Sequence, residues 1–189
     1  MDKIIIGSDH AGFFLKGKLK IYLKKNRFSI EDVGTYSRER CDYPEFAFGV
    51  ASGVSSGRFK RGILICKSGI GNSIMANRFP GVRAALCYSI KAARLSRQHN
   101  DSNILILGSG FVTQKQALAI LRVWLNTEFQ GGRHKRRLSL IKRLEKICAR
   151  RLKRLPGLPD PRWKHLSTAG LELLTGKLAN NQYGKIKTD

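Results

Sequence analysis

The chain has 189 residues, enough for one domain with its own hydrophobic core and an extension. It holds 36 lysines and arginines against 13 acidic residues, and the resulting net charge of +23 attracts phosphates, from sugar phosphates to nucleic acid. No apolar run approaches the length that spans a membrane, so we expect no membrane partner.

The hydrophobic pattern predicts strands that alternate with helices. The expected strands cover residues 4–7, 28–33, 63–66, 82–87 and 103–107. The expected helices cover residues 15–23, 44–54, 73–78, 89–98 and 113–124, and Thr113 with Gln116 forms a capping box. This alternation predicts an α/β fold of the Rossmann-like kind, a doubly wound five-stranded parallel sheet covered on both faces.

The character of the sequence changes after residue 126. A basic hinge over residues 131–137 leads into a further helix, which has no strand of its own to cover and which we expect to pack on another subunit. Residues 155–163 hold three of the five prolines and read as a linker, and residues 166–178 could form a short amphipathic helix. We therefore divide the chain into an α/β domain over residues 1–150 and a basic extension over residues 151–189.

The cysteines bear on metal binding and compartment. They lie far apart without a Cys-x-x-Cys pair, which argues against a zinc site or a disulfide framework. They are Cys41, Cys66, Cys87 and Cys148. Free thiols suit a reducing compartment, and the first residues lack the pattern of a signal peptide. We expect a cytoplasmic protein, with a mitochondrial or other organellar matrix as the alternative.

The most informative stretch is residues 62–78. A short apolar run ends at Cys66, and Gly69 and Gly71 then form a turn that leads into a helix. Open parallel sheets place their chemistry at this end of a strand. Because the thiol of Cys66 lies beside a helix N-terminus and the cation Lys67, we expect it to ionise readily and to act as a base or nucleophile.

Two known glycine-rich motifs do not fit this stretch. A dinucleotide-binding fingerprint needs a third glycine where Ile74 stands, and a phosphate-binding loop needs glycine where Cys66 stands. Both motifs are excluded. The remaining alternative is that Cys66 is only a buried strand cysteine and that the glycines only make a tight turn.

Six stretches occur together in the order of one known family. They are residues 7–12 (GSDHAG), 32–36 (DVGTY), 41–44 (CDYP), 65–71 (ICKSGIG), 94–100 (RLSRQHN) and 126–134 (NTEFQGGRH). Together they resemble the ribose-5-phosphate isomerase B family, which also includes the galactose-6-phosphate isomerase subunits. The resemblance spans about residues 3–147 and excludes the tail. His10 and residues 98–100 resemble the ribose branch.

The resemblance implies an enzyme of pentose phosphate metabolism that interconverts ribose 5-phosphate and ribulose 5-phosphate through an enediolate, without a metal or organic cofactor. His99 suits the acid–base step that opens the sugar ring. Cys66 would move the proton between C1 and C2. The Ser68 hydroxyl and the backbone N–H groups of the loop would stabilise the enediolate and bind substrate. That loop consists of Lys67, Ser68, Gly69, Ile70 and Gly71.

The remaining substrate contacts are also implied by the resemblance. Arg133 and Arg137 lie one helical turn apart and would hold the phosphate together with His10. Asp9 and Asn100 would bind sugar hydroxyls or the reacting oxygens. The family's site lies between two subunits, so we expect a homodimer with a shared active site. The sequence leaves open whether the substrate is a pentose phosphate or a hexose phosphate such as allose or galactose 6-phosphate.

Structural alternatives exist for these roles. His99 could cap a helix, Asp9 could be the N-cap of the first helix, and the two arginines could belong to a solvated basic face. The chain departs from the family at Lys67, where glycine is usual, at Gly110, where arginine is usual, and in its basic tail. These departures and the charge support an alternative function, a weakened isomerase-like protein recruited as an RNA-contacting subunit of a ribonucleoprotein such as an organellar ribosome.

Overall fold

The computed structural model describes residues 3–152, of which residues 3–145 belong to one compact unit. Its centre is a five-stranded sheet in the order β2-β1-β3-β5-β4, with every paired strand parallel. The strands are β1 (Lys3–Ser8), β2 (Ser29–Asp32), β3 (Arg61–Cys66), β4 (Ala84–Leu86) and β5 (Ile104–Gly108). The predicted doubly wound parallel sheet is confirmed.

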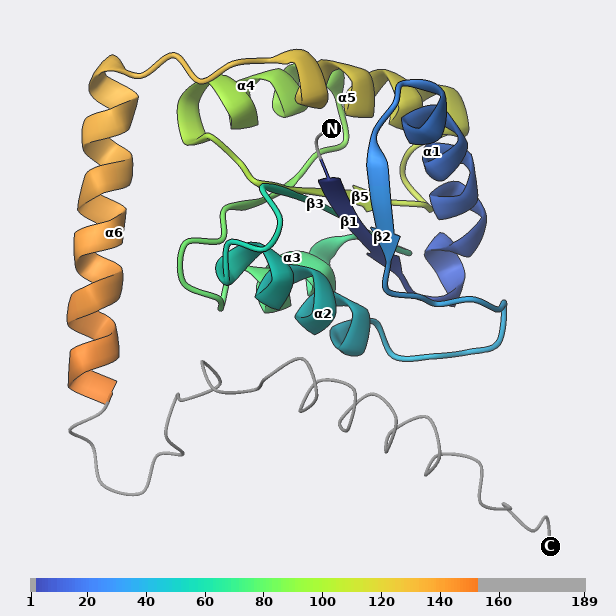
Figure 1. Cartoon of the computed structure of the whole chain (residues 1–189), viewed down its shortest axis with the longest axis horizontal. Helices are drawn as coiled ribbons and strands as arrows, with labels where there is room; N and C mark the ends of the chain where they lie inside the picture. Colours follow the sequence, from blue (N-terminus) through green and yellow to red (C-terminus); the bar gives the residue numbers. More distant parts are fainter. Residues whose placement is uncertain (1–2, 153–189) are drawn as a thin grey trace, which may run out of the picture. The chain divides into compact units, whose positions relative to one another are not determined.

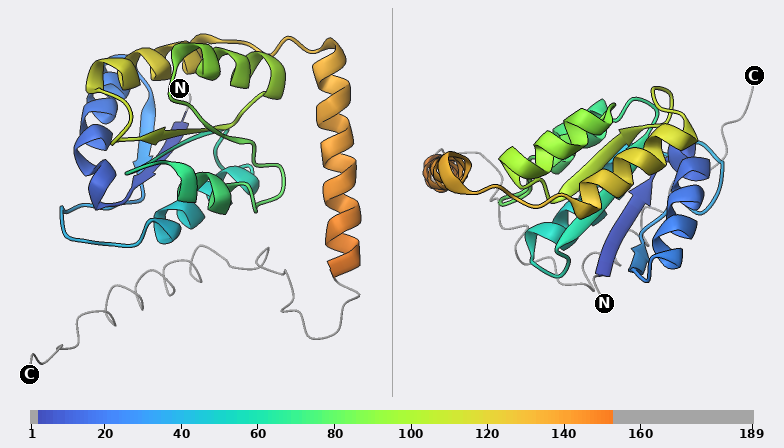
Figure 2. Two further views of the ribbon diagram at one scale, coloured as in Figure 1. Left: turned by 180° about the vertical axis from the view of Figure 1, so that it is seen from behind. Right: turned by 90° about the horizontal axis from the view of Figure 1, so that it is seen from above.

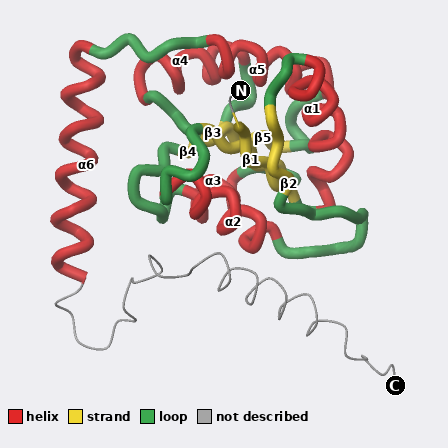
Figure 3. The backbone as a smooth tube through the Cα atoms, in the orientation of Figure 1, coloured by secondary structure: helices red, strands yellow, loops and turns green. Residues whose placement is uncertain are grey.

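Helices cover both faces of this sheet. Helices α1, α4 and α5 lie on one face and α2 and α3 on the other, as seen from the front and from behind (Figures 1 and 2) and by element type (Figure 3). The bounds are η1 (His10–Gly12), α1 (Phe13–Lys25), α2 (Tyr43–Ser55), α3 (Ile70–Ala76), α4 (Ile90–Asn100), α5 (Gln114–Asn126) and α6 (Gly132–Leu152).

The central strands explain why the sheet is the core. The apolar residues 63–65 of β3 are wholly buried because helices cover both sides, as their uninterrupted apolar run predicts. Trp124 of α5 is also fully buried, and its indole N–H donates to Ser102 Oγ at 2.8 Å. Each buried side chain of this size stabilises the fold by about 1.5–3 kcal/mol relative to exposure.

Some boundaries differ from the prediction for local reasons. β4 begins at Ala84 because the N–H of Arg83 donates to the side chain of Asn103 at 2.7 Å instead of to a strand. α3 begins at Ile70, earlier than predicted, because Gly69 adopts a φ of +82° and acts as its N-cap. The capping box of Thr113 and Gln116 is confirmed.

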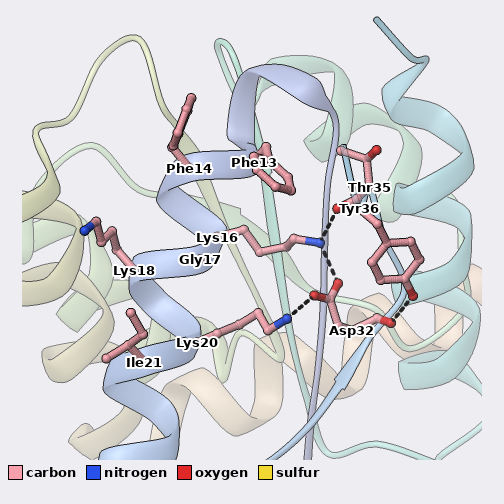
Figure 4. A pocket seen from close by; sticks show the side chains of 10 residues that line it. All are labelled: Phe13, Phe14, Lys16, Gly17, Lys18, Lys20, Ile21, Asp32, Thr35 and Tyr36. Atoms are coloured by element: carbon pink, nitrogen blue, oxygen red, sulfur yellow. Dashed lines mark hydrogen bonds and ion pairs between the residues drawn. The ribbon is translucent and has the colours of Figure 1, made fainter. Parts of the chain in front are cut away.

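A pocket of about 420 Å³ lies between α1 and the end of β2 (Figure 4). Its deepest polar group is Lys16, which is 2 % exposed and whose Nζ donates to Asp32 at 2.6 Å and to the Thr35 carbonyl at 2.7 Å. Lys20 binds the second carboxylate oxygen of Asp32. These contacts tie α1 to the loop that follows β2.

The predicted helix after residue 131 is confirmed as α6, and Leu140, Ile141 and Leu144 on it are about half exposed. Within residues 3–152, no helix combines the length and apolarity needed to cross a membrane. No His, Cys, Asp or Glu side chains in the same range gather into a set that could hold a metal ion. The predicted linker and the predicted helix over residues 166–178 lie outside the described residues.

Candidate active site

The predicted site residues fall into two groups at opposite edges of the sheet. The first, called here the carboxyl-edge group, follows the ends of β1 and β3 and comprises Asp9, His10, Cys66, Lys67, Ser68, Gly69, Ile70 and Gly71. The second, the amino-edge group, lies at the end of α4 and the start of α6 and comprises His99, Asn100, Arg133 and Arg137.

Asp9 and His10 are held in place by hydrogen bonds to the backbone of neighbouring segments. The N–H of Asp9 donates to the Ile65 carbonyl at 3.3 Å, and its carboxylate accepts from the N–H of Gly12 at 3.0 Å, so Asp9 caps η1. Burial raises the pKa of Asp9, and the Gly12 N–H partly opposes this. His10 Nδ1 lies 3.2 Å from the backbone N of Cys41.

Cys66 is the last residue of β3 and is 4 % exposed. Its Sγ accepts a hydrogen bond from the N–H of Gly69 at 3.1 Å. The expectation that its thiol ionises readily is wrong for this structure, because burial raises the pKa of Cys66 more than the Gly69 N–H lowers it, and the Asp9 carboxylate raises it further. Cys66 is therefore a buried strand cysteine whose sulfur also faces an N–H donor.

The loop after Cys66 is tightly packed. The N–H of Ile70 donates to Ser68 Oγ at 3.3 Å, and a β-carbon at Gly71 would stand 2.3 Å from the ring of Tyr43. Two amide donors expected to face an enediolate, those of Gly69 and Ile70, thus bond inside the loop in this structure. The ring of Tyr43 therefore packs directly on the backbone at Gly71 and would have to move if a side chain were added there.

The amino-edge group lies at the far edge because of the order of the elements. α4 connects the carboxyl end of β4 to the amino end of β5, so its last residues return to the amino edge. The carbonyl of Asn103, just beyond α4, accepts from the N–H of Gly62 at 2.9 Å, near the start of β3. Cys66 is four residues further along β3, about 13 Å at 3.3 Å per residue.

Within this group the rings of His99 and His134 stack, with centroids 4.2 Å apart and planes within 5°. The Nε of Arg133 lies 3.5 Å from His134 Nε2, and Arg133 and Arg137 are exposed. Burial, with the charges of His99, Arg133 and Arg137, lowers the pKa of His134. The capping alternative for His99 is wrong, because the C-cap of α4 is Asp101.

Three buried polar residues to which sequence reasoning gave no role lie near the two groups. Among the described residues, the buried side-chain atoms without a hydrogen-bond partner are Ser8 Oγ and both polar atoms of Asn72. Ser8 ends β1, and Asn72 lies in the first turn of α3, so both are near the carboxyl-edge group. His134 is the third. Asn72 lies three residues after Gly69 and four before Ala76, so the three share one buried helix face. A polar residue at a position where the helical pattern predicts burial is the signal that could have identified Asn72.

Comparison with known proteins places these residues in a family. The Ribose/Galactose Isomerase family model matches residues 4–141. Ribose-5-phosphate isomerase B of Escherichia coli is 45% identical over 145 residues, which cover 77% of this chain and 97% of that protein. A probable ribose-5-phosphate isomerase B of Mycoplasma genitalium is also 45% identical, over 76% of this chain and 95% of its own.

Solved structures agree in fold. The ribose-5-phosphate isomerase B of Clostridium thermocellum is 49% identical with a TM-score of 0.76, covering 77% of this chain and 99% of its own. That of Mycoplasma genitalium, solved with bound ribulose-5-phosphate, is 43% identical with a TM-score of 0.74, covering 76% and 96%. None of these relatives favours the ribonucleoprotein alternative. The chain belongs to the ribose/galactose isomerase family.

Proposed function

We propose that this protein interconverts ribose 5-phosphate and ribulose 5-phosphate. The observation that carries the proposal is the placement of the buried Cys66 at the carboxyl edge of the sheet, where its sulfur accepts from the Gly69 N–H and where the buried carboxylate of Asp9 follows the neighbouring strand β1. The 43% identity to a protein whose structure holds ribulose-5-phosphate supports the choice of a pentose phosphate.

Ring opening comes first. The imidazolium of His99 donates a proton to the ring oxygen as the bond between C1 and that oxygen breaks, and the C1 hydroxyl loses its proton as the carbonyl forms. Asp9 is suited to take that second proton because burial raises the pKa of its carboxyl. The open-chain aldehyde is the species that the next step needs.

Isomerisation follows by proton transfer between carbons. The thiolate of Cys66 removes the proton from C2, which leaves an enediolate with its charge on oxygen, and the thiol then returns the proton to C1. The hydrogen of the C2 hydroxyl ends on O1, so C2 becomes the carbonyl carbon. Arg133 and Arg137 hold the phosphate, for which two planar guanidinium groups suit several oxygens at once.

We also propose that the active site is shared between the two chains of a homodimer. Because the two groups of site residues lie at opposite edges of one sheet, a single chain separates Cys66 from His99. A second copy can supply its amino-edge group to the carboxyl-edge group of the first. The exposed apolar side chains of Leu140, Ile141 and Leu144 on α6 fit such a contact. We propose the cytoplasm as the compartment, because the four cysteines are free thiols and free thiols suit a reducing environment.

The activity is tested by assaying the purified full-length chain with ribose 5-phosphate. Cys66→Ala should reduce kcat on the order of 10²–10⁴-fold, the range typical of a lost acid–base group. Cys87→Ala is a matched control, since Cys87 is also buried but has no role in the site. Normal turnover by Cys66→Ala would remove the thiol from the mechanism, and no turnover by the unaltered chain would refute the function.

The shared site is tested by mixing two inactive variants. Cys66→Ala and His99→Ala each spoil one group, so a heterodimer of them contains one site with both defects and one intact site. After subunit exchange, about a quarter of the wild-type activity should return, because half of the dimers are mixed and half of their sites are intact. No recovery in the mixture, with exchange verified by mass spectrometry of tagged chains, would show a site confined to one chain.

A further inference from the structure

We propose that His134 is a positioning residue that holds the imidazole of His99 by stacking against it and links that ring to Arg133. This inference rests on the proposed function, in which His99 opens the sugar ring and Arg133 holds the phosphate. It adds a residue whose side chain acts on the site through its neighbours.

The stack is a specific contact between two different elements. His99 is the penultimate residue of α4 and His134 lies in the first turn of α6, yet their ring planes differ by only 5° at a centroid separation of 4.2 Å. A ring against the face of His99 restricts rotation about its side-chain bonds. An acid–base group needs such restriction, because proton transfer falls off steeply when the donor is misplaced.

The burial of His134 sets it apart from its own helix. It is 7 % exposed, while Arg133 before it and Lys135 after it are exposed. Over residues 132–150, His134 is the one buried residue of α6. A helix that buries a single imidazole and leaves leucine and isoleucine exposed uses that ring for a contact other than general apolar packing.

The second contact of His134 reaches the phosphate-binding side chain. The Nε–H of Arg133 donates to Nε2 of His134 at 3.5 Å. An accepting Nε2 requires a neutral imidazole that carries its proton on Nδ1. Burial and the positive charges of His99, Arg133 and Arg137 lower the pKa of His134 and favour this neutral form. His134 thus remains an acceptor for the Nε–H of Arg133.

The backbone around both rings is fixed, so that the stack does not depend on the two side chains alone. The N–H of Gln130 donates to the Gln98 carbonyl at 3.0 Å, which ties the segment before α6 to the end of α4. The N–H of His134 donates to the Gly131 carbonyl at 3.0 Å. Positions 98–99 and 130–134 therefore form one connected unit that carries His99, His134 and Arg133.

Two substitutions separate stacking from hydrogen bonding. His134→Phe keeps an aromatic ring against His99 but removes the acceptor of Arg133, whereas His134→Ala removes both. We expect His134→Phe to raise KM and to keep kcat within about two-fold, and His134→Ala to lower kcat on the order of ten-fold. Lys135→Ala, on the exposed neighbour, is the matched control and should change neither constant.

A readout independent of activity is the NMR signal of the His99 ring. In the free protein, His134→Ala should move the His99 ring-proton resonances downfield, because the ring current of the stacked partner is lost. His134→Phe should retain most of the ring-current shift. The melting temperature of each variant shows whether the fold is kept. If His134→Ala is unstable, His134→Phe still tests whether a ring stacked on His99 maintains kcat and the His99 spectrum.

The outcomes distinguish this inference from the function on which it rests. If His99→Ala is as active as the unaltered chain, the proposed role of His99 fails. If His99→Ala is inactive but folded His134→Ala keeps wild-type kcat and an unshifted His99 spectrum, the positioning role of His134 is overturned and the function stands. Equal loss of kcat in His134→Phe and His134→Ala would also overturn the stacking role.

Discussion

The side chain of Lys67 lies against the backbone of Gly110. A β-carbon at Gly110 would stand 2.9 Å from Cε and 3.1 Å from Cδ of the lysine, and the N–H of Gly110 donates to the Lys67 carbonyl at 2.9 Å. The lysine stem therefore occupies the space that a side chain at position 110 would need. This places the lysine stem between the loop after β3, which carries the site, and the loop after β5.

We predict that Gly110→Ala affects substrate binding through Lys67. The stem is flexible, so the free energy of unfolding should change by less than about 1 kcal/mol, but the ammonium group must move and KM should rise. Lys67→Ala should raise KM as well. In a double-mutant cycle the two effects should not add, because both displace the same charge. Additive effects on KM would contradict the coupling.

The raised pKa of Cys66 predicts an alkaline rate profile. The base must be deprotonated to take a proton from carbon, and a pKa above the ordinary 9.0 leaves less thiolate at any given pH. We therefore expect kcat/KM to go on rising at about pH 9 instead of levelling near neutrality. The profile should be compared with a thiolate titration by ultraviolet absorbance, taken as the difference from Cys66→Ala. If kcat/KM instead reached half of its maximum near neutral pH, the thiol would ionise more readily than the structure predicts.

What the sequence predicted well was set by local pattern. The apolar residues 63–65 specify a buried strand wherever the rest of the chain lies, and Thr113 with Gln116 specifies a helix start through its own side chains. The separation of Cys66 from His99 was also within reach, since a helix between two parallel strands must end at their amino edge.

What it missed depends on contacts between distant residues. The sequence places Lys67 next to Cys66 and so favours ionisation, but it does not show that packing buries the sulfur. The stack of His99 on His134 joins positions 35 residues apart and leaves no periodic signal. In the same way, the start of β4 is decided by the Asn103 side chain, which binds the N–H of Arg83.

The buried pair of Lys16 and Asp32 gives a stability prediction. Asp32→Asn would leave the ammonium of Lys16, which is 2 % exposed, without its counter-ion, and a broken buried pair typically costs about 3–5 kcal/mol. The loss should appear in the urea midpoint. Lys16→Met with Asp32→Asn should recover most of it, because no unpaired charge is left buried. A double variant no more stable than Asp32→Asn alone would show that the loss has another cause.

For Asn72 we predict a substitution that increases the stability of the fold. Its side chain is 1 % exposed and neither its Oδ1 nor its Nδ2 has a partner, so folding removes the amide from water without a compensating hydrogen bond. Leaving such a group unpaired costs about 1–3 kcal/mol, and leucine has the same branching at Cγ with apolar atoms in place of the amide. Asn72→Leu should therefore raise the free energy of unfolding, measured by urea at constant m-value. Asn77→Leu is the control that should destabilise, because the Asn77 amide binds the backbone of Ala84 through both its oxygen and its nitrogen. A lower stability for Asn72→Leu would show that water or another group satisfies the amide in the folded protein.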